Sequence, residues 1–179
     1  SHLLERLIGA REYNVIILKR SYSKTWRIDH ILGKVKSYNV DEVSLSDIFL
    51  ENSIDIIIHL ATLYRKFDND GDDIKQMLES NVVFPSKLLE LGVRSGATGF
   101  INTGTFFEYD CSQLPVTEHA KSKPFNFYAK TKLAFESLLS TYADKMNIVT
   151  LRLFSPYGEK DNEKIIPMII RKSLSNERI

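Results

Sequence analysis

The sequence has 179 residues, 43% of them apolar, which suits one large globular domain, or a domain plus a further piece, with a substantial core. The formal net charge is +1, and Lys and Arg are scattered among acidic residues, which argues against a nucleic-acid-binding protein. No apolar run reaches the ~18 residues that span a membrane, and the single Cys111 excludes an intrachain disulfide, so we expect a cytoplasmic protein that does not enter membranes.

Helix-like and strand-like patterns alternate along the chain. Strands are predicted at residues 15–18, 35–40, 54–60, 100–103 and 148–154. Helices are predicted at residues 1–8, around 44–50, at 74–91, from 128 to about 145, and at 165–174. Gly92 is expected to end the helix that begins at Ile74, and the acidic stretch 66–73 is expected to be an exposed loop.

This alternation predicts an α/β fold, a doubly wound parallel sheet of Rossmann-like type with right-handed crossovers. Dinucleotide-binding folds of this type begin with a strand and a glycine-rich turn that seats a pyrophosphate. The sequence starts inside what would be the following helix, so we expect it to lack that first strand and the glycine-rich loop, as a segment of a longer protein. Residues 1–160 are then a partial dinucleotide-binding domain, and residues 161–179 begin a truncated substrate-binding portion.

Tyr128 and Lys132 are four residues apart in a predicted helix, so they share one helix face. A phenol titrates near 10 and is a poor base at neutral pH. An ammonium group about 4 Å away would favour the phenolate by roughly 4 kcal/mol at an effective dielectric constant near 20, before desolvation is subtracted. We therefore expect the pKa of Tyr128 to fall by about two, which would suit a general acid–base. The alternative is two polar residues on a solvated helix face.

Upstream of this pair, residues 99–105 read as a short buried strand that runs into a glycine-containing turn, which would expose Thr103 at the carboxyl end of the strand. Together with residues 57–62, Asn81, residues 114–118 and residues 151–158, this pattern resembles the extended short-chain dehydrogenase/reductases, the NAD(P)-dependent epimerase/dehydratase family, which modifies nucleotide-linked sugars. The resemblance implies that the Ser/Thr–Tyr–Lys triad of the family falls on Thr103, Tyr128 and Lys132.

The cofactor expectation depends on the end of the first predicted strand, where the family carries an acid for NAD or a cation for the 2′-phosphate of NADP. Here Lys19 and Arg20 stand at that position and no acid is present, so NADP is expected, with NAD as the alternative. Two solvated charges would give the same pattern. Asp41, after the next strand, matches an acid that faces the adenine amino group, although a plain turn residue is an equal alternative.

The resemblance implies further contacts along the chain. The family positions that line the cofactor fall on Leu60, Ala61, Thr62, Asn81 and Phe154, and those that face the substrate fall on Thr105 and Ser155. His59 is expected to be a packed strand residue, and no metal site is expected. Because Pro85 has no N–H, the main-chain carbonyl of Asn81 loses its helical partner, and we expect it to face Lys132 as part of a proton relay; a packing kink is the alternative.

Three functional classes stay open. The first is NADPH-dependent reduction of a nucleotide-linked 4-keto-6-deoxy sugar, because residues 102–107 and 166–170 resemble the CDP-abequose and CDP-paratose synthases. Gly104 and Thr105 stand where dehydratases carry an Asp–Glu pair, which argues against dehydration. The second is a nucleotide-sugar epimerase with retained NAD, and the third a non-enzymatic dinucleotide-binding sensor, which the intact triad disfavours. The expected partner is the nucleotide-linked sugar, and a homodimer is a candidate assembly.

Overall fold

The computed structural model describes residues 1–65, 71–112, 114–159, 161 and 164–176. The chain forms two compact units, one made of Ser1–Ile48 with Tyr157–Ile179 and the other of Phe49–Pro156. These bounds differ from the predicted division at residue 160. That residues 1–160 bind the dinucleotide and residues 161–179 begin the substrate-binding portion stays a prediction. Among the helices that the structure describes, none is both long and apolar enough to cross a membrane.

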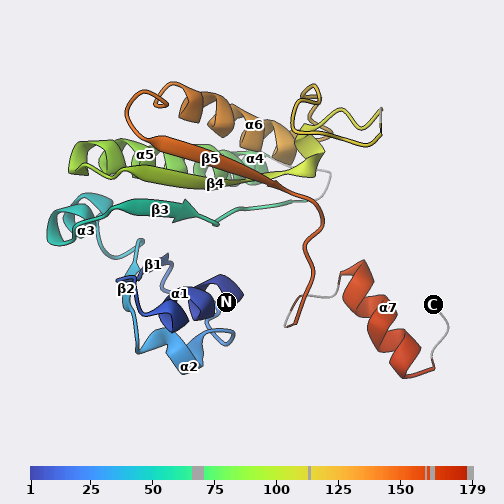
Figure 1. Ribbon diagram of the computed structural model, residues 1–179, viewed down its shortest axis with the longest axis horizontal. Helices are drawn as coiled ribbons and strands as arrows, with labels where there is room; N and C mark the ends of the chain where they lie inside the picture. The colour runs from blue at the N-terminus through green and yellow to red at the C-terminus, as the bar shows by residue number, and fades with distance from the viewer. Residues whose placement is uncertain (66–70, 113, 160, 162–163, 177–179) are drawn as a thin grey trace. The chain divides into compact units, whose positions relative to one another are not determined.

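The first unit contains a small parallel sheet (Figure 1). Its elements are α1 (His2–Ala10), β1 (Ile16–Lys19), α2 (Asp29–Leu32), β2 (Lys36–Asn39) and, from the end of the chain, α7 (Ile165–Leu174). In the parallel register Ile16 lies opposite Lys36 and Lys19 lies opposite Asn39, so both strands end at the same edge. Both strands were predicted, whereas the short α2 was not, because four residues give too little periodicity to recognise.

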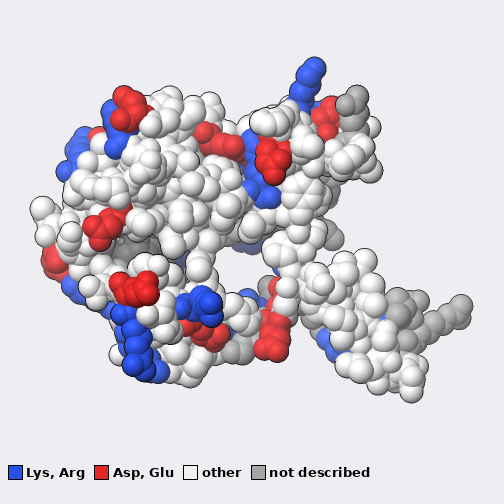
Figure 2. Space-filling model, viewed as in Figure 1, with Lys and Arg blue, Asp and Glu red and all other residues white. Residues whose placement is uncertain are grey.

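The second unit contains a three-stranded parallel sheet in the order β3-β4-β5. Its strands are β3 (Ile56–His59), β4 (Gly99–Thr105) and β5 (Asn147–Leu153), and α3 (Leu45–Glu51) precedes β3 across the boundary between the units. The register pairs His59 with Asn102 and Thr105 with Leu153. Parallel strands joined through helices confirm the predicted α/β fold. On the face of the molecule shown in Figure 2, basic and acidic side chains are interspersed rather than gathered by sign.

The segment predicted as one helix from residue 74 to residue 91 is built in three parts. They are α4 (Gly71–Leu78), the π-helical turn η1 (Glu79–Val83) and α5 (Phe84–Ser95). The helix begins earlier than predicted, and Asp72 and Asp73 lie in its first turn, where carboxylates interact favourably with the helix dipole. Pro85 falls in the first turn of α5, where a missing N–H costs little. Residues 66–70 of the predicted loop lie outside the described residues.

Gly92 does not end this helix, contrary to the prediction. The helix runs on to Ser95 and is capped by Gly96, whose φ of 83° lies in the left-handed region that glycine adopts readily. A Cβ on Gly92 would lie 2.6 Å from the Cδ1 atom of Ile57, so this glycine permits close packing of α5 on β3. The glycine thus serves packing rather than termination.

Helix α6 (Phe127–Ser140) covers the same sheet and carries the predicted catalytic pair (Figure 1). The side chain of Asn126 caps its start by accepting a hydrogen bond from the Ala129 N–H at 2.8 Å. Phe135 of α6 packs on Phe100 of β4, with ring centroids 5.9 Å apart, and both rings are fully buried. The helix ends at Ser140, earlier than predicted, and turns lead to β5. This packing fixes α6 against the strand that leads to the site.

Candidate active site

Tyr128 and Lys132 lie one turn apart near the start of α6. The Tyr128 ring is partly buried and meets the Tyr64 ring edge-on, with centroids 5.1 Å apart. Its hydroxyl oxygen accepts a hydrogen bond from Thr62 Oγ1 at 3.4 Å. Lys132 is only 1% exposed, and its Nζ atom makes no hydrogen bond to the residues that the structure describes. The helix therefore carries a phenol that is partly exposed to solvent and a buried ammonium group whose N–H groups make no hydrogen bond to the described residues.

Burial sets the acid–base character of this pair. It raises the pKa of Tyr128 above its ordinary value, against the opposing effect of the Thr62 hydrogen bond. The prediction that Lys132 lowers the pKa of Tyr128 is therefore wrong: Lys132 is not among the groups that shift it, and desolvation dominates. Burial also lowers the pKa of Lys132 to about 8, although the carboxylates of Glu108 and Glu136 act in the opposite direction.

Asn81, which is fully buried in η1, ties the segment after β3 to α6. Its Oδ1 atom accepts a hydrogen bond from the Leu63 N–H at 2.8 Å and lies 3.3 Å from Thr62 Oγ1, whose single proton can go either to Asn81 or to the Tyr128 oxygen. Its Nδ2 atom donates to the Leu63 carbonyl at 2.8 Å and to Thr131 Oγ1 at 3.0 Å. Asn81 thus positions Thr62, and through it the Tyr128 hydroxyl. Because Lys132 makes no hydrogen bond to a described residue, the predicted relay has no direct bond from Lys132 to the Asn81 carbonyl.

The strand that carries Thr103 is longer than predicted, and this changes the position of its hydroxyl groups. β4 continues through Gly104 and ends at Thr105. The Thr103 hydroxyl donates to the main-chain carbonyl of His59 on β3 at 3.0 Å, whereas Thr105 stands at the carboxyl end of the strand. Gly104, predicted to lie in a turn, is a residue of β4. A Cβ added to Gly104 would lie 2.9 Å from Arg152 Cγ, so only glycine fits there without a shift of its neighbours. The premise that β4 ends at Thr103 is wrong, but Thr103 is partly exposed whereas Thr105 is buried; the role of Thr103 stays a prediction.

Glu108 is a residue of the site that the sequence reading missed. It ends η2 (Phe106–Glu108), which follows β4, and it is fully buried. Its Oε1 atom accepts a hydrogen bond from the Thr105 N–H at 2.6 Å, which completes a capping box with Thr105. Burial raises the pKa of Glu108 to about 7, and Glu136 acts in the same direction. The Thr-x-x-Glu spacing of the capping box was the signal in the sequence.

His59 is buried, as predicted, and serves packing. Its ring lies 6.3 Å from that of Phe100 and 5.8 Å from that of Phe135, both measured between centroids. Burial lowers the pKa of His59 to about 4, and the charge of Lys132 adds to the effect, so the imidazole is neutral at physiological pH. His59 is therefore a neutral core residue that packs against the rings of Phe100 and Phe135.

The first unit brings together the three residues predicted to meet the adenosine part of a cofactor. Lys19 Nζ donates a hydrogen bond to Asn39 Oδ1, and the Arg20 guanidinium lies 5.9 Å from the centre of the Tyr22 ring. The Asp41 carboxylate accepts from the Ser21 N–H at 2.8 Å and from the Ser21 hydroxyl at 2.5 Å, and these bonds lower its pKa. Lys19, Arg20 and Asp41 therefore cluster at the carboxyl ends of β1 and β2.

The other predicted contacts lie in the second unit, after the ends of β3 and β5. Leu60, Ala61 and Thr62 are exposed directly after β3. The ring of Phe154, 56% exposed, lies 5.6 Å from that of Phe106, and Ser155 has a left-handed backbone with φ 40°. These positions are open to a ligand at the carboxyl edge of the sheet.

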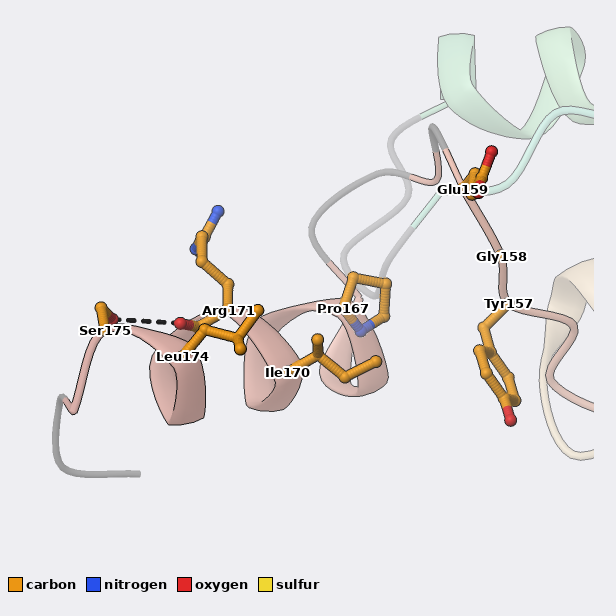
Figure 3. A pocket seen from close by; sticks show the side chains of 8 residues that line it. All are labelled: Tyr157, Gly158, Glu159, Pro167, Ile170, Arg171, Leu174 and Ser175. Atoms are coloured by element: carbon orange, nitrogen blue, oxygen red, sulfur yellow. Dashed lines mark hydrogen bonds between the residues drawn. The ribbon is translucent and has the colours of Figure 1, made fainter.

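A cavity of about 680 Å³ lies in the first unit. Figure 3 shows that it is lined by the segment after β5 and by α7, through Tyr157, Gly158, Glu159, Pro167, Ile170, Arg171, Leu174 and Ser175. None of the predicted site residues lines it. Within the described ranges, no three His, Cys, Asp or Glu residues are grouped so that they could hold a metal ion.

Comparisons with known proteins identify the family and the fold of this chain. The family model described as "NAD dependent epimerase/dehydratase family" matches residues 1–179. A CDP-abequose synthase of Salmonella muenchen is 29% identical over 187 residues, covering 100% of this chain and 57% of the relative. That of Yersinia pseudotuberculosis is 32% identical over 139 residues, which are 76% of this chain and 46% of the relative. The chain spans about half the length of the curated relatives it matches.

Solved structures share the fold. The UDP-glucuronic acid 4-epimerase from Bacillus cereus in complex with NAD superposes with a TM-score of 0.81 at 23% identity, covering 98% of this chain and 59% of that one. The UDP-glucose 4-epimerase of Thermus thermophilus, also in complex with NAD, gives a TM-score of 0.80 at 20% identity, covering 99% of this chain and 60% of the other. Both likenesses confirm the Rossmann-like architecture.

Proposed function

The chain belongs to the NAD dependent epimerase/dehydratase family, and on that premise we propose that the whole protein is an NADPH-dependent reductase of a nucleotide-linked 4-keto-6-deoxy sugar. The observation that carries the proposal is that α6 places the partly exposed Tyr128 one turn from the buried Lys132. The likeness to CDP-abequose synthases supports the reductase among the activities of the family.

The residues present fit a dinucleotide. The buried Nζ of Lys132 has no protein partner in the described part of the chain, and an unpaired buried ammonium group is costly, so a ribose hydroxyl is a suitable acceptor for it. The exposed segment Leu60–Thr62 offers a surface at the carboxyl edge of the sheet, where such folds bind their ligands. When bound, the nicotinamide would supply the hydride that adds to the ketone carbon.

Tyr128 would supply the proton of this reaction. Its raised pKa keeps the phenol protonated at neutral pH, so the O–H can pass its proton to the ketone oxygen as that oxygen becomes an alkoxide. Thr62 holds the phenol oxygen through its hydroxyl, and the same hydrogen bond would stabilise the phenolate that is left. Water then restores the phenol proton. We propose that the Thr103 or Thr105 hydroxyl orients the ketone.

The preference for NADPH rests on the first unit. A 2′-phosphate carries up to two negative charges. Among the described contacts, Arg20 presents its guanidinium next to an aromatic ring rather than in an ion pair, while Lys19 donates to an amide oxygen. Each charge-assisted hydrogen bond to the phosphate contributes roughly 1.5–3 kcal/mol, so one good contact corresponds to about ten- to hundredfold preference. The second candidate function, an epimerase with retained NAD, is favoured by the likeness to the NAD-bound 4-epimerase from Bacillus cereus.

The test is kinetic. The values of kcat/KM for NADPH and NADH are measured for the whole protein with a nucleotide-linked 4-keto-6-deoxy sugar. We expect one NADPH consumed per sugar reduced and at least tenfold preference over NADH. An equal or better value with NADH would remove the argument from Lys19 and Arg20, and isomerisation of a sugar without net NADPH loss would favour the epimerase.

The role of Tyr128 is tested in the same assay. Tyr128→Phe removes the transferable proton, so we expect kcat to fall by about 10²- to 10⁴-fold with cofactor affinity nearly unchanged. The control is Tyr142→Phe, which removes a phenol that donates to Glu90 at 2.8 Å and is not part of the site. Full activity of Tyr128→Phe would contradict the proposed mechanism.

A further inference from the structure

Glu108 joins three elements of the candidate site. Its Oε1 atom accepts the hydrogen bond from the last N–H of β4, at Thr105, and its Oε2 atom lies 3.2 Å from Arg152 Nε on β5. Arg152 in turn pairs with Glu136 of α6, through Nη2 and Oε1 at 2.8 Å and through Nε and Oε2 at 3.2 Å. A single buried carboxyl group therefore connects the end of β4 with β5 and with the helix that carries Tyr128 and Lys132.

The charges in this cluster do not balance if both carboxyl groups are ionised. The Nε–H of Arg152 is directed at Glu136, so its contact with Glu108 is ionic and lacks hydrogen-bond geometry. Two carboxylates then share one guanidinium in a space where Glu108 is 0% exposed. Two carboxylates beside one guanidinium favour retention of one proton, and burial, together with Glu136, raises the pKa of Glu108 to about 7.

The cluster reaches the reacting groups through charge. An ionised Glu108 raises the pKa of both Tyr128 and Lys132. The other groups that face this carboxyl are Arg152 of β5, whose guanidinium also lies 4.5 Å from the Tyr109 ring centre, and Glu136 of α6. Gly104 leaves room for the arrangement, because a Cβ there would lie 2.9 Å from Glu108 Oε1.

We propose that Glu108 is a positioning residue of the active site: as a neutral acid it holds the end of β4 in place against Arg152 and Glu136, and loss of its proton places a second carboxylate beside Glu136 and slows proton transfer from Tyr128. The second half of this inference rests on the proposed reductase function. In the reductive direction a weaker phenol protonates the alkoxide more slowly, so kcat should fall as Glu108 ionises. No step requires Glu108 to touch the substrate.

Two substitutions separate the two parts of the role. Glu108→Gln keeps the acceptor for the Thr105 N–H and cannot ionise, so it should match the unmodified protein at pH 6 and lack the fall in kcat that we expect with a midpoint near pH 7. Glu108→Ala removes the acceptor, so kcat should drop about ten- to hundredfold at every pH, with KM changed less. The control, Glu90→Gln, alters a carboxylate that contacts Arg94 and Tyr142 away from the site and should change neither quantity.

A readout without turnover keeps this inference separate from the proposed function. In the whole protein, the ¹⁵N–¹H signal of the Thr105 amide should shift with pH around a midpoint near 7, and Glu108→Gln should abolish that titration. If no nucleotide sugar is reduced but the amide titrates as expected, the reductase proposal fails and the positioning contact stands. An amide signal that titrates identically in both proteins, or a kcat midpoint unchanged in Glu108→Gln, would overturn the role of Glu108.

Discussion

Lys132→Met should stabilise the fold while it removes activity. The ammonium group is buried and only 1% exposed, so screening by solvent is small. Burial lowers its pKa from 10.5 to about 8, even after the opposing effect of Glu108 and Glu136. At about 1.4 kcal/mol per pKa unit, keeping this charge in the folded protein costs on the order of 3 kcal/mol at pH 7. Met has a similar length and no charge to desolvate, so most of this cost should be recovered.

The dependence on pH follows from the same shift. Between pH 8 and 10.5 the unfolded chain binds the proton of Lys132 and the folded chain does not. Stability should therefore rise with pH across this window, by up to about 1.4 kcal/mol per pH unit from this group. Below pH 8 both states hold the proton and this contribution is constant. In Lys132→Met the contribution disappears, so the curve across the window should be flatter.

The assay is urea-induced unfolding of the whole protein at pH 7 and at several values from pH 8 to 10.5. The control is Lys130→Met, which changes an exposed lysine on the same helix and should leave stability within about 0.5 kcal/mol. Reductase activity of Lys132→Met is measured alongside and should be lost. If Lys132→Met unfolds more easily than the unmodified protein at pH 7, or shows the same rise from pH 8 to 10.5, then Lys132 is stabilised by its surroundings and the reasoning fails.

Two further predictions concern the end of β4. Thr105→Val removes the hydroxyl that caps η2 at the end of β4, so kcat should fall by at least tenfold, whereas Thr103→Val removes a hydroxyl that donates to the main-chain carbonyl of His59 and should change kcat less. Kinetics of both variants decide, and the reverse ranking would favour Thr103 as the triad residue. Gly104→Ala should lower the free energy of unfolding by about 1–3 kcal/mol, since the new methyl group would meet the side chains of Arg152 and Glu108. The control is Gly9→Ala, which has open space in a helix and should leave stability unchanged or raise it. Unfolding curves in which both variants behave alike would contradict the crowding at Gly104.

The strands and most helices could be predicted because their signals are local. The continuous apolar run at residues 15–18 and the largely apolar stretch at residues 54–60 appear as β1 and β3, since strands of a parallel sheet need apolar side chains on both faces. Gly92 was misread because a glycine is used both for a left-handed cap and for close packing. Which use applies depends on Ile57, far away in sequence. The same limit hid the strand position of Gly104, whose neighbour Arg152 lies on β5.

The site shows the same division between local and tertiary causes. Helical spacing was enough to place Tyr128 and Lys132 on one helix, since four residues make about one turn. It was not enough to predict the pKa of Tyr128, because desolvation depends on the packing around α6, including the ring of Tyr64. Glu108 could have been found from the capping-box spacing after Thr105. Its contact with Arg152 could not, since that pairing exists only once β4 and β5 are adjacent.

The protonation state of the site bears on the choice between reductase and epimerase. Burial raises the pKa of Tyr128, so at neutral pH the group is a phenol, which is the form that donates a proton to an alkoxide. An epimerase must also oxidise its sugar, and for that step the tyrosine has to accept a proton as phenolate. Each pKa unit above the ambient pH adds about 1.4 kcal/mol to the cost of that form. An ionised Glu108 increases this cost, because its negative charge raises the pKa of Tyr128 further. The raised pKa of Tyr128 therefore weighs against the oxidation step of an epimerase, whereas for reduction the tyrosine is already in its proton-bearing form.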